Sequence, residues 1–354
     1  MLKFIHASDF HLDSAFGALT EKQAAARRRE SRELGYRLAN YVNTHGIDLV
    51  LLAGDLFDSG SAFRDTREQL AAALGQMEAR VFIAPGNHDH VHPRSPYIAT
   101  SWPDNVHIFT TPRWEQVELP GLNCVVHGRA FDGPHLERSP LAGLTIPRDG
   151  RIHLLCLHGE VGREGRYGPI APSELAACGA HYAALGHVHA CSGLQREGEV
   201  YWAYPGCPEG RGFDELGDKG VLAVEVEPEH VSARLIPLCQ RRHRIEILTA
   251  GQPLPTAQSP DLIRFLVRGE CAVPPDVVQM AAQLAPLHFH VEVRDETTLP
   301  QDLWARQQED SLTGLFLREL HRMLDSAGPE ERDRLILAAR FGLAALEGGE
   351  DIRP

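Results

Sequence analysis

The sequence of 354 residues lacks several features that would assign it to a particular class. No apolar run approaches the roughly 20 residues that a membrane-spanning helix needs. The seven cysteines are scattered and odd in number, and no Cys-x-x-Cys pair occurs, so neither a disulfide framework nor a cysteine zinc site is indicated. We therefore expect reduced thiols in a cytosolic protein. No internal repeat and no long low-complexity segment is present.

Basic residues are outnumbered by acidic ones: there are 35 Lys and Arg against 48 Asp and Glu, which gives a formal net charge of -13. Proteins that bind nucleic acid by bulk charge usually carry a basic face, so this balance argues against that class. A nuclease stays open, because bound divalent cations and local arginines can recruit phosphate. The N-terminus runs straight into the first motif described below. A cleavable signal peptide would remove that motif, so we expect a cytoplasmic protein.

The sequence does contain five short motifs rich in His, Asp and Asn within its first 190 residues. They are Asp9-Phe10-His11, Gly54-Asp55, Gly86-Asn87-His88-Asp89, Leu157-His158-Gly159 and Gly186-His187-Val188-His189. These residue types bind hard or borderline metals. Each motif follows an apolar run that is typical of a strand. This placement predicts one site, assembled from loops at the ends of several strands.

The first 90 residues alternate between strand and helix patterns. Strands are predicted over residues 2–7, 48–53 and 81–84. A long helix opens at the capping box Thr20-x-x-Gln23, and a second helix covers roughly residues 62–78. This βαβαβ order implies neighbouring parallel strands with right-handed crossovers. Sites in open α/β sheets lie beyond the carboxyl ends of such strands, where the motifs fall.

Beyond residue 150, the sequence pattern changes from strands to a linker with a β-α-β unit, and then to two helices. Further strands are predicted over residues 152–157, 200–203, 221–226 and 231–235, and a Pro/Gln/Ser-rich stretch at 251–260 is typical of a linker. A β-α-β pattern follows, with strands at 262–267 and 288–293 and a helix near 275–284. Two amphipathic helices close the chain, one at about 311–325 and one that starts at Pro329 and ends before Gly348.

The spacing within the motifs suits metal ligation. Asp9 and His11 lie two residues apart on an extended chain, so both side chains can reach one cation. His187 and His189 share that geometry. Asp55 is a carboxylate at a strand end, and a carboxylate can bridge two cations.

Asn87 and His158 can complete a second coordination sphere. Two metals about 3.5–4 Å apart bind a bridging hydroxide and stabilise the attacking and leaving oxygens of an in-line displacement at phosphorus. His88, between Asn87 and Asp89, is then free to protonate or stabilise the leaving oxygen as a general acid.

The ordered set of motifs resembles the calcineurin-like metallophosphoesterases. The resemblance implies an α/β four-layer sandwich of two mixed sheets flanked by helices, and a dinuclear metal site. It implies that one metal is held by Asp9, His11, Asp55 and His189, and the second by Asp55, Asn87, His158 and His187. His88 matches the catalytic histidine of the family. Mixed oxygen and nitrogen ligation permits Mn, Fe or Zn, and the resemblance favours Mn.

Within that family the chain resembles the branch of SbcD/YhaO-type DNA-repair exonucleases. Residues 54–58, Gly-Asp-Leu-Phe-Asp, resemble one signature of the SbcD type. Residues 204–209, with the Phe-Asp-Glu at 213–215 and Lys-Gly at 219–220, resemble a second, in which Ser more commonly fills the position of Cys207. The C-terminal helices look more like the YhaO type. His181 departs from the relatives, which often carry Asp there; it lies outside the ligand set, so we expect tuning of the site.

The resemblance divides the chain into three parts and implies a function. We predict a metallophosphoesterase (nuclease) domain at residues 1–245, a capping domain at 246–300 and a C-terminal helical segment at 301–354. The implied function is a metal-dependent DNA phosphodiesterase, an exonuclease in DNA repair. Its partners would be DNA, an SbcC-like coiled-coil ATPase that supplies a basic DNA-binding surface, and a second copy in a homodimer.

Two other functions compete with this one. A small-molecule phosphomonoesterase or cyclic-nucleotide phosphodiesterase would use the same site, but the cap and the Tyr-Pro-Gly segment at 204–206 argue against it. A non-catalytic scaffold subunit with a vestigial site is disfavoured by the complete ligand set.

Some residues have two interpretations. Asp58, placed with His88 in the catalytic set, either orients the phosphodiester or caps the following helix near Ser61. The run Arg27-Arg28-Arg29-x-x-Arg32 either contacts DNA phosphates or, as we prefer, forms a solvated helix face. His6 and His127 are expected to be packed or hydrogen-bonded histidines of strands.

Overall fold

The computed structural model describes residues 1–162, 165–227, 230–271, 275–298 and 304–346. The contacts divide the chain into two compact units. Unit 1 comprises Met1–Glu246, Leu254–Phe265 and Val278–Val293, and unit 2 comprises Ile247–Pro253, Leu266–Val277 and Arg294–Pro354. The predicted division into three parts stays a prediction, and its boundary at 300/301 lies outside the described residues.

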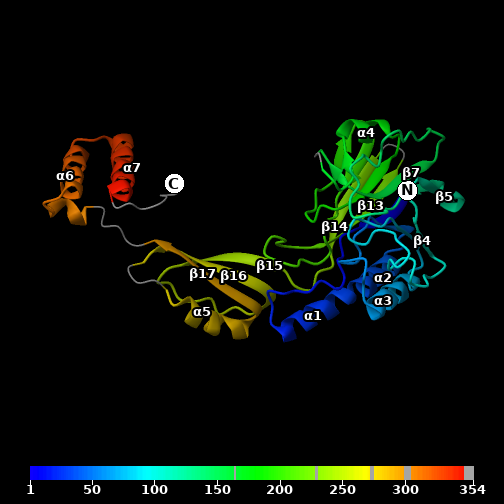
Figure 1. Cartoon of the computed structure of the whole chain (residues 1–354), viewed down its shortest axis with the longest axis horizontal. Coiled ribbons are helices and arrows are strands. Elements are labelled where there is room, and N and C mark those ends of the chain that lie inside the picture. Colours follow the sequence, from blue (N-terminus) through cyan, green and yellow to red (C-terminus); the bar gives the residue numbers. More distant parts are fainter. Residues whose placement is uncertain (163–164, 228–229, 272–274, 299–303, 347–354) are drawn as a thin grey trace. The chain divides into compact units, whose positions relative to one another are not determined.

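The first sheet of unit 1 has six strands in the order β14-β13-β1-β2-β3-β4. Its edge strands β14 and β4 are labelled in Figure 1. These strands are β1 (Leu2–Ala7), β2 (Leu49–Leu52), β3 (Arg80–Ile83), β4 (Val106–Ile108), β13 (Gly220–Glu227) and β14 (His230–Pro237). Strands β1 to β4 are parallel, as the predicted βαβαβ order requires, and β13 and β14 add an antiparallel edge. All four residues of β2 are buried, which explains its continuous apolar run.

The second sheet also has six strands, in the order β11-β12-β10-β7-β6-β5. They are β5 (Glu115–Leu119), β6 (Cys124–Gly128), β7 (Ile152–His158), β10 (Tyr182–Gly186), β11 (Gln195–Glu197) and β12 (Val200–Ala203). Strands β6, β7, β10 and β12 are parallel, and antiparallel strands flank them on both sides. Both sheets are therefore mixed.

The two sheets pack face to face through a shared apolar core. Phe4 from the first sheet contacts Tyr182 from the second at 5.3 Å between ring centroids, within one cluster of buried side chains. Helices α2 (Leu34–Thr44) and α3 (Arg64–Gly75) cover the outer face of the first sheet, and α4 (Pro172–Ala177) packs on that of the second. This arrangement confirms the predicted four-layer sandwich.

One predicted helix is two. Helix α1 (Glu21–Arg32) opens at the predicted capping box of Thr20 and Gln23, but it ends at Arg32, and α2 begins at Leu34 after the single residue Glu33. The apolar residues at helical spacing, Leu34, Leu38 and Val42, all belong to α2 and are buried. Helix α1 buries Arg27 and Glu30, so its buried face is polar and gives no apolar period.

His6 and His127 are buried histidines of strands, as predicted. The His6 ring lies 3.0 Å from both Tyr182 Oη and the Leu185 carbonyl oxygen, and burial lowers its pKa to about 3. His127 Nε2 lies 3.0 Å from His153 Nδ1, and burial lowers the pKa of His127 to about 4. Both histidines therefore carry no charge near neutral pH.

The remaining elements include a three-stranded sheet in the order β15-β16-β17. Its strands are β15 (His243–Thr249), β16 (Ser259–Glu270) and β17 (His288–Thr298), with α5 (Val277–Leu284) between the last two, as the β-α-β pattern predicts. A short pair, β8 (Glu160–Val161) and β9 (Pro169–Ile170), and the 3-10 turns Pro120–Leu122, Ala285–Leu287 and Ala305–Gln308 complete the set with two C-terminal helices.

Helices α6 (Leu312–Leu324) and α7 (Pro329–Leu346) lie in unit 2 and match their predicted ranges. Ser311 caps α6, because its hydroxyl oxygen accepts a hydrogen bond from the Gly314 amide. The described residues contain no helix that combines the length and apolar character needed to cross a membrane. All seven cysteines are free thiols.

Candidate metal centre

The predicted site residues lie at the carboxyl ends of five parallel strands. Asp9 and His11 follow β1, Asp55 follows β2, and Asn87 and His88 follow β3, all in the first sheet. The other three come from the second sheet: His158 ends β7, and His187 and His189 follow β10. Each sheet alone holds only part of the set, and the face-to-face packing joins the two parts.

The four residues predicted for one metal converge. His11 Nε2 lies 3.1 Å from His189 Nε2 and 3.9 Å from Asp55 Oδ2, and His189 Nε2 lies 3.8 Å from Asp9 Oδ1. Ligand atoms of Asp9, His11 and His189 all lie within 4.8 Å of one another, close enough for a common cation, and Asp55 approaches the same group through His11.

Three of the four residues predicted for the second metal also converge. His158 Nε2 lies 3.4 Å from Asp55 Oδ2 and 3.0 Å from Asn87 Oδ1. The fourth, His187, is less closely placed: its ring centroid is 5.3 Å from that of His158, and its Nε2 lies 3.9 Å from Glu160 Oε2. Its backbone amide donates to the Asp9 carboxylate at 3.1 Å.

The atoms that face the centre are hydrogen-bond acceptors. His158 Nδ1 lies 2.9 Å from the Ala53 carbonyl oxygen, which can only accept, so Nδ1 carries a proton and Nε2 is the nitrogen left for a second proton or a cation. Nε2 faces Asn87 Oδ1 and the Asp55 carboxylate. Acceptors repel one another at 3.0–3.4 Å unless a proton or a cation lies between them. The donor set therefore fits divalent cations.

The charge balance leads to the same conclusion. Asp9 and Asp55 are 0% and 1% exposed, and in the described chain no lysine or arginine forms an ion pair with either. Burial raises the pKa of Asp55, but His158, His11 and His88 outweigh it and bring that pKa below its usual range. Burial lowers the pKa of His158, but Asp55 reverses the effect and raises it to about 9. The buried carboxylates thus require positive charge.

Four of these residues adopt a backbone conformation that side chains disfavour. The φ angles of Asp9, His11, Asp55 and His187 are 55°, 43°, 53° and 108°. Such conformations cost of order 1–3 kcal/mol each and persist where the surroundings impose them. Here the Asp9 amide donates to the Gly54 carbonyl at 2.9 Å and the His11 amide to that of Asp55 at 3.0 Å. These hydrogen bonds hold the strained backbone in the conformation that brings the side chains to the candidate centre.

Asp89 ties two of the loops together. Its carboxylate is fully buried and accepts from the amides of Leu56 at 2.7 Å and Gly86 at 2.8 Å, and from the Tyr97 hydroxyl at 2.5 Å. The loop after β2 and the loop after β3 are thereby held in register. The spacing of the motif gave Asp89 no role, because its partners become neighbours only in the folded chain.

His88 differs from the other histidines of the centre in being exposed. Its Nδ1 donates to the Asp58 carbonyl oxygen at 3.0 Å, so Nε2 is the atom left for a ligand. Its backbone amide donates to Asp55 Oδ1 at 2.9 Å, which keeps it beside the centre. The ring lies 4.7 Å from that of His11 between centroids.

Asp58 does not cap a helix. Helix α3 is preceded by Phe63, and no side chain caps it. Asp58 instead contacts His11 and Arg211, at 3.2 Å in both cases. Arg211 and Glu215, which contact His189, were missed by the sequence analysis. The Phe-Asp-Glu at 213–215 was part of a signature, but no spacing rule connects it to a histidine 26 residues earlier.

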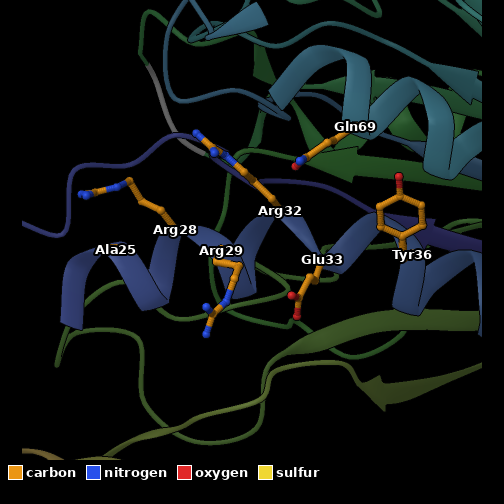
Figure 2. Close-up of a pocket in the computed structure, with 7 residues that line it drawn as sticks. All are labelled: Ala25, Arg28, Arg29, Arg32, Glu33, Tyr36 and Gln69. Atoms are coloured by element: carbon orange, nitrogen blue, oxygen red, sulfur yellow. The ribbon is translucent and has the colours of Figure 1, made fainter. Parts of the chain in front are cut away.

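The arginine run is not a simple solvated face, so the preferred interpretation was wrong in part. Arg27 is fully buried, and Arg28 and Arg32 hold the loop after His11 through the Ala15 carbonyl at 3.2 Å and Asp13 at 3.0 Å. A pocket of about 330 Å³ lies there, lined by Ala25, Arg28, Arg29, Arg32, Glu33, Tyr36 and Gln69. Figure 2 shows Arg28 and Arg32 on the side of α1 that faces Gln69, with Arg29 projecting away.

The family model of the calcineurin-like phosphoesterases matches residues 2–191, more than half of the chain. The chain belongs to this family. The match includes all five motifs, whose side chains converge in the structure as described above.

Several curated proteins are similar to the chain. The uncharacterized metallophosphoesterase YhaO of Bacillus subtilis is 32% identical over 259 residues, which cover 69% of this chain and 61% of YhaO. The DNA double-strand break repair protein Mre11 of Aeropyrum pernix is 28% identical over 272 residues, 70% of this chain and 64% of Mre11. The chain thus spans less than two thirds of each. The SbcD component of the nuclease SbcCD of Escherichia coli is 29% identical over 93 residues, 25% of this chain and 22% of SbcD.

These relatives agree with the predicted SbcD/YhaO-type branch. A solved structure described as a novel archaeal phosphodiesterase aligns with 66% of this chain and 100% of that chain, at 13% identity. Its TM-score of 0.35 is too low to support an argument.

Proposed function

We propose that the protein is a metal-dependent phosphodiesterase that hydrolyses DNA phosphodiester bonds, as an exonuclease in DNA repair. The observation that carries the proposal is the candidate metal centre, in which two buried carboxylates and the Nε2 atoms of His11, His158 and His189 face one another. The names of two relatives, a double-strand break repair protein and a nuclease component, support DNA as the substrate.

The residues fit two divalent cations, for which we propose Mn. Asp9, His11, Asp55 and His189 would hold one, and Asp55, Asn87, His158 and His187 the other. When bound, such a pair supplies the attacking hydroxide and stabilises charge on the phosphate. Asp55 is suited to the shared position, because its Oδ2 lies within 4 Å of both His11 and His158.

His88 supplies the proton in this proposal. Its Nε2 is the ring nitrogen left for a substrate, because Nδ1 donates to the Asp58 carbonyl, and its exposed ring can approach a bound phosphodiester. To act as the acid, the ring must be an imidazolium that carries a second proton on Nε2, and it returns to neutral imidazole when the leaving oxygen takes that proton. Such proton donation contributes typically 10²–10⁴-fold to the rate. Its backbone bond to Asp55 keeps that imidazole in place while substrate binds and product leaves.

The acidic chain would work on DNA together with partners. A formal net charge of -13 disfavours long-range attraction of a polyanion. The name of the SbcCD relative indicates that it works with another subunit. We propose that a coiled-coil ATPase of the SbcC type is the partner here and supplies basic surface, and that the protein forms a homodimer. A cytoplasmic location is part of the same proposal.

Paired substrates test the proposal. The purified chain is given Mn²⁺ with end-labelled linear duplex DNA, and separately with bis-p-nitrophenyl phosphate, each beside His88→Ala as a control. We expect Mn²⁺-dependent loss of the end label and hydrolysis of the small diester. Hydrolysis of the small diester alone, with DNA intact also in the presence of a partner ATPase, would contradict DNA as the substrate. Inactivity on both would contradict the phosphodiesterase.

A further inference from the structure

Two histidines of the centre are held in the same way. The Nε2 atoms of His11 and His189 face each other at 3.1 Å. On the far side of each ring, Nδ1 meets a carboxylate: Asp58 Oδ1 at 3.2 Å from His11, and Glu215 Oε1 at 2.6 Å from His189. A carboxylate can only accept a hydrogen bond, so each contact holds the proton on Nδ1 and leaves the lone pair on Nε2.

One arginine connects the two carboxylates. Arg211 Nη1 lies 3.2 Å from Asp58 Oδ1, and Nη2 lies 3.4 Å from Glu215 Oε1. The Arg211 amide also donates to Glu215 Oε2 at 2.7 Å. Nη2 is 3.0 Å from His189 Nδ1 as well, but two donors cannot bond to each other. With the proton of Nδ1 directed to Glu215, the guanidinium serves the carboxylates and not the ring.

The loop that carries Arg211 is itself anchored by a buried ion pair. Arg27 of α1 is 0% exposed and donates to Glu209 Oε1 at 2.6 Å and to the Gly210 carbonyl oxygen at 2.9 Å. Arg37 of α2 adds a bond to Glu209 Oε2 at 3.1 Å. The position of the loop that carries Arg211 is therefore set by α1 and α2.

We propose that Asp58 and Glu215, bridged by Arg211, are the positioning residues of one metal position of the centre. They select the tautomer in which both His11 and His189 offer Nε2 to the same divalent cation. Carboxylates at the second nitrogen of a metal-binding histidine orient the ring and raise its basicity. This inference deepens the proposed metal site, and it gives Asp58 a supporting task in place of contact with substrate.

The positioning role predicts a different effect for each substitution. Glu215→Ala removes the acceptor, so His189 is free to rotate and to change tautomer. Glu215→Gln keeps an oxygen at that place but loses its charge, and we expect an intermediate effect. Arg211→Ala leaves two carboxylates without their bridge. Asp214→Asn is the matched control, since Asp214 is an exposed carboxylate next to Glu215 in the same loop.

The test uses the full chain and measures metal binding and a histidine tautomer, not activity. Binding of Mn²⁺ alone to metal-free protein is measured by calorimetry. The tautomer of His189 is read from ¹⁵N-histidine spectra, assigned by comparison with His189→Gln. We expect a 10–100-fold loss of affinity at one of the two sites in Glu215→Ala and a smaller loss in Glu215→Gln. The Nδ1–H tautomer should dominate in the wild type and in Asp214→Asn, and give way to a mixture in Glu215→Ala.

Unchanged Mn²⁺ affinity together with an unchanged tautomer in Glu215→Ala would overturn the proposal. If that variant fails to fold, wild-type affinity and tautomer in both Glu215→Gln and Arg211→Ala overturn it equally. The outcome is separate from that of the proposed function, because neither measurement involves DNA. A chain that binds two Mn²⁺ ions and cleaves no DNA refutes the nuclease and leaves the positioning role standing.

Discussion

The loops around the metal centre and the C-terminal helix pair use their side chains in opposite ways. In the loops of unit 1, polar residues such as Asp9, Asp55 and Asp89 are buried, and each meets specific partners. In α6 and α7 of unit 2, large apolar residues stay exposed. Leu312, Leu315 and Phe341 are 68%, 58% and 47% exposed, while Leu317, Ala339 and Leu343 form a small buried core.

The two regions differ in how far their side chains depend on fixed partners. A buried polar group depends on every one of its partners, because an unpaired one costs about 1–3 kcal/mol. An exposed apolar side chain depends on none in the chain itself. We therefore expect the loops to tolerate almost no substitution and the exposed faces of the helices to tolerate many. Substitutions in the two regions test that contrast.

Asp55→Ala should have the largest effect. Asp55 is the only assigned residue that would contact both cations, so its removal should reduce bound Mn from two ions per chain to fewer than one and abolish hydrolysis. His189→Gln, at a terminal position, should keep at least one ion. Elemental analysis of the purified variants gives the comparison. Two tightly retained ions in Asp55→Ala would refute the shared position.

His88→Ala should spare the metals and reduce the rate. We expect a loss of about 10²–10⁴-fold on DNA, because the leaving oxygen has no proton donor. p-Nitrophenolate needs little protonation, so hydrolysis of the small diester should suffer much less. The rates on both substrates and the Mn content are measured on one preparation. A wild-type rate on DNA would eliminate His88 as the acid.

Asp89→Ala should destabilise the fold as well as the site. The substitution leaves the amides of Leu56 and Gly86 and the hydroxyl of Tyr97 without their buried acceptor. We expect the free energy of unfolding to fall by about 3–5 kcal/mol. Tyr97→Phe removes only one donor and should cost about 1–2 kcal/mol. Urea unfolding of both variants would show equal losses if Asp89 did not join the loops.

Acid should weaken the fold through its buried histidines. Burial lowers the pKa of His6 to about 3 and that of His243 to about 4, against 6.5 in the unfolded chain. The unfolded state therefore binds more protons below pH 6.5, and stability falls as the pH drops from there toward 4. Each histidine contributes at most about 1.4 kcal/mol per pH unit. His6→Gln should flatten the dependence of unfolding free energy on pH, whereas the exposed control His45→Gln should not.

Phe341→Ser should have the smallest effect. Its ring is 47% exposed in α7, so stability should change by no more than about 0.5 kcal/mol and hydrolysis of the small diester not at all. Leu317→Ser, at a fully buried position of α6, is the contrast and should unfold the helix pair. Thermal unfolding and circular dichroism distinguish the two. A large loss of stability in Phe341→Ser would mean that the helices bury that face.

Many of the strands and helices, and the residue types that gather at the candidate centre, can be predicted from the sequence. Apolar runs mark β1, β2 and β3 to within two residues, because the side chains of a buried strand are selected locally for burial. Metal-binding residue types directly after those runs predicted which side chains meet, since parallel strands place their carboxyl ends at one edge. Local spacing could carry this information because strand and loop geometry is itself local.

The contacts that surround those residues arise only when the chain folds. Asp58 and Arg211 are 153 residues apart, and Glu215 and His189 are 26 apart, so no periodicity relates them. No pattern in the sequence indicates that Arg27 is buried, yet it anchors the loop that carries Arg211. The division of the centre between two sheets likewise follows from their packing. Such contacts depend on how the faces meet in space, and residue order does not encode that meeting locally.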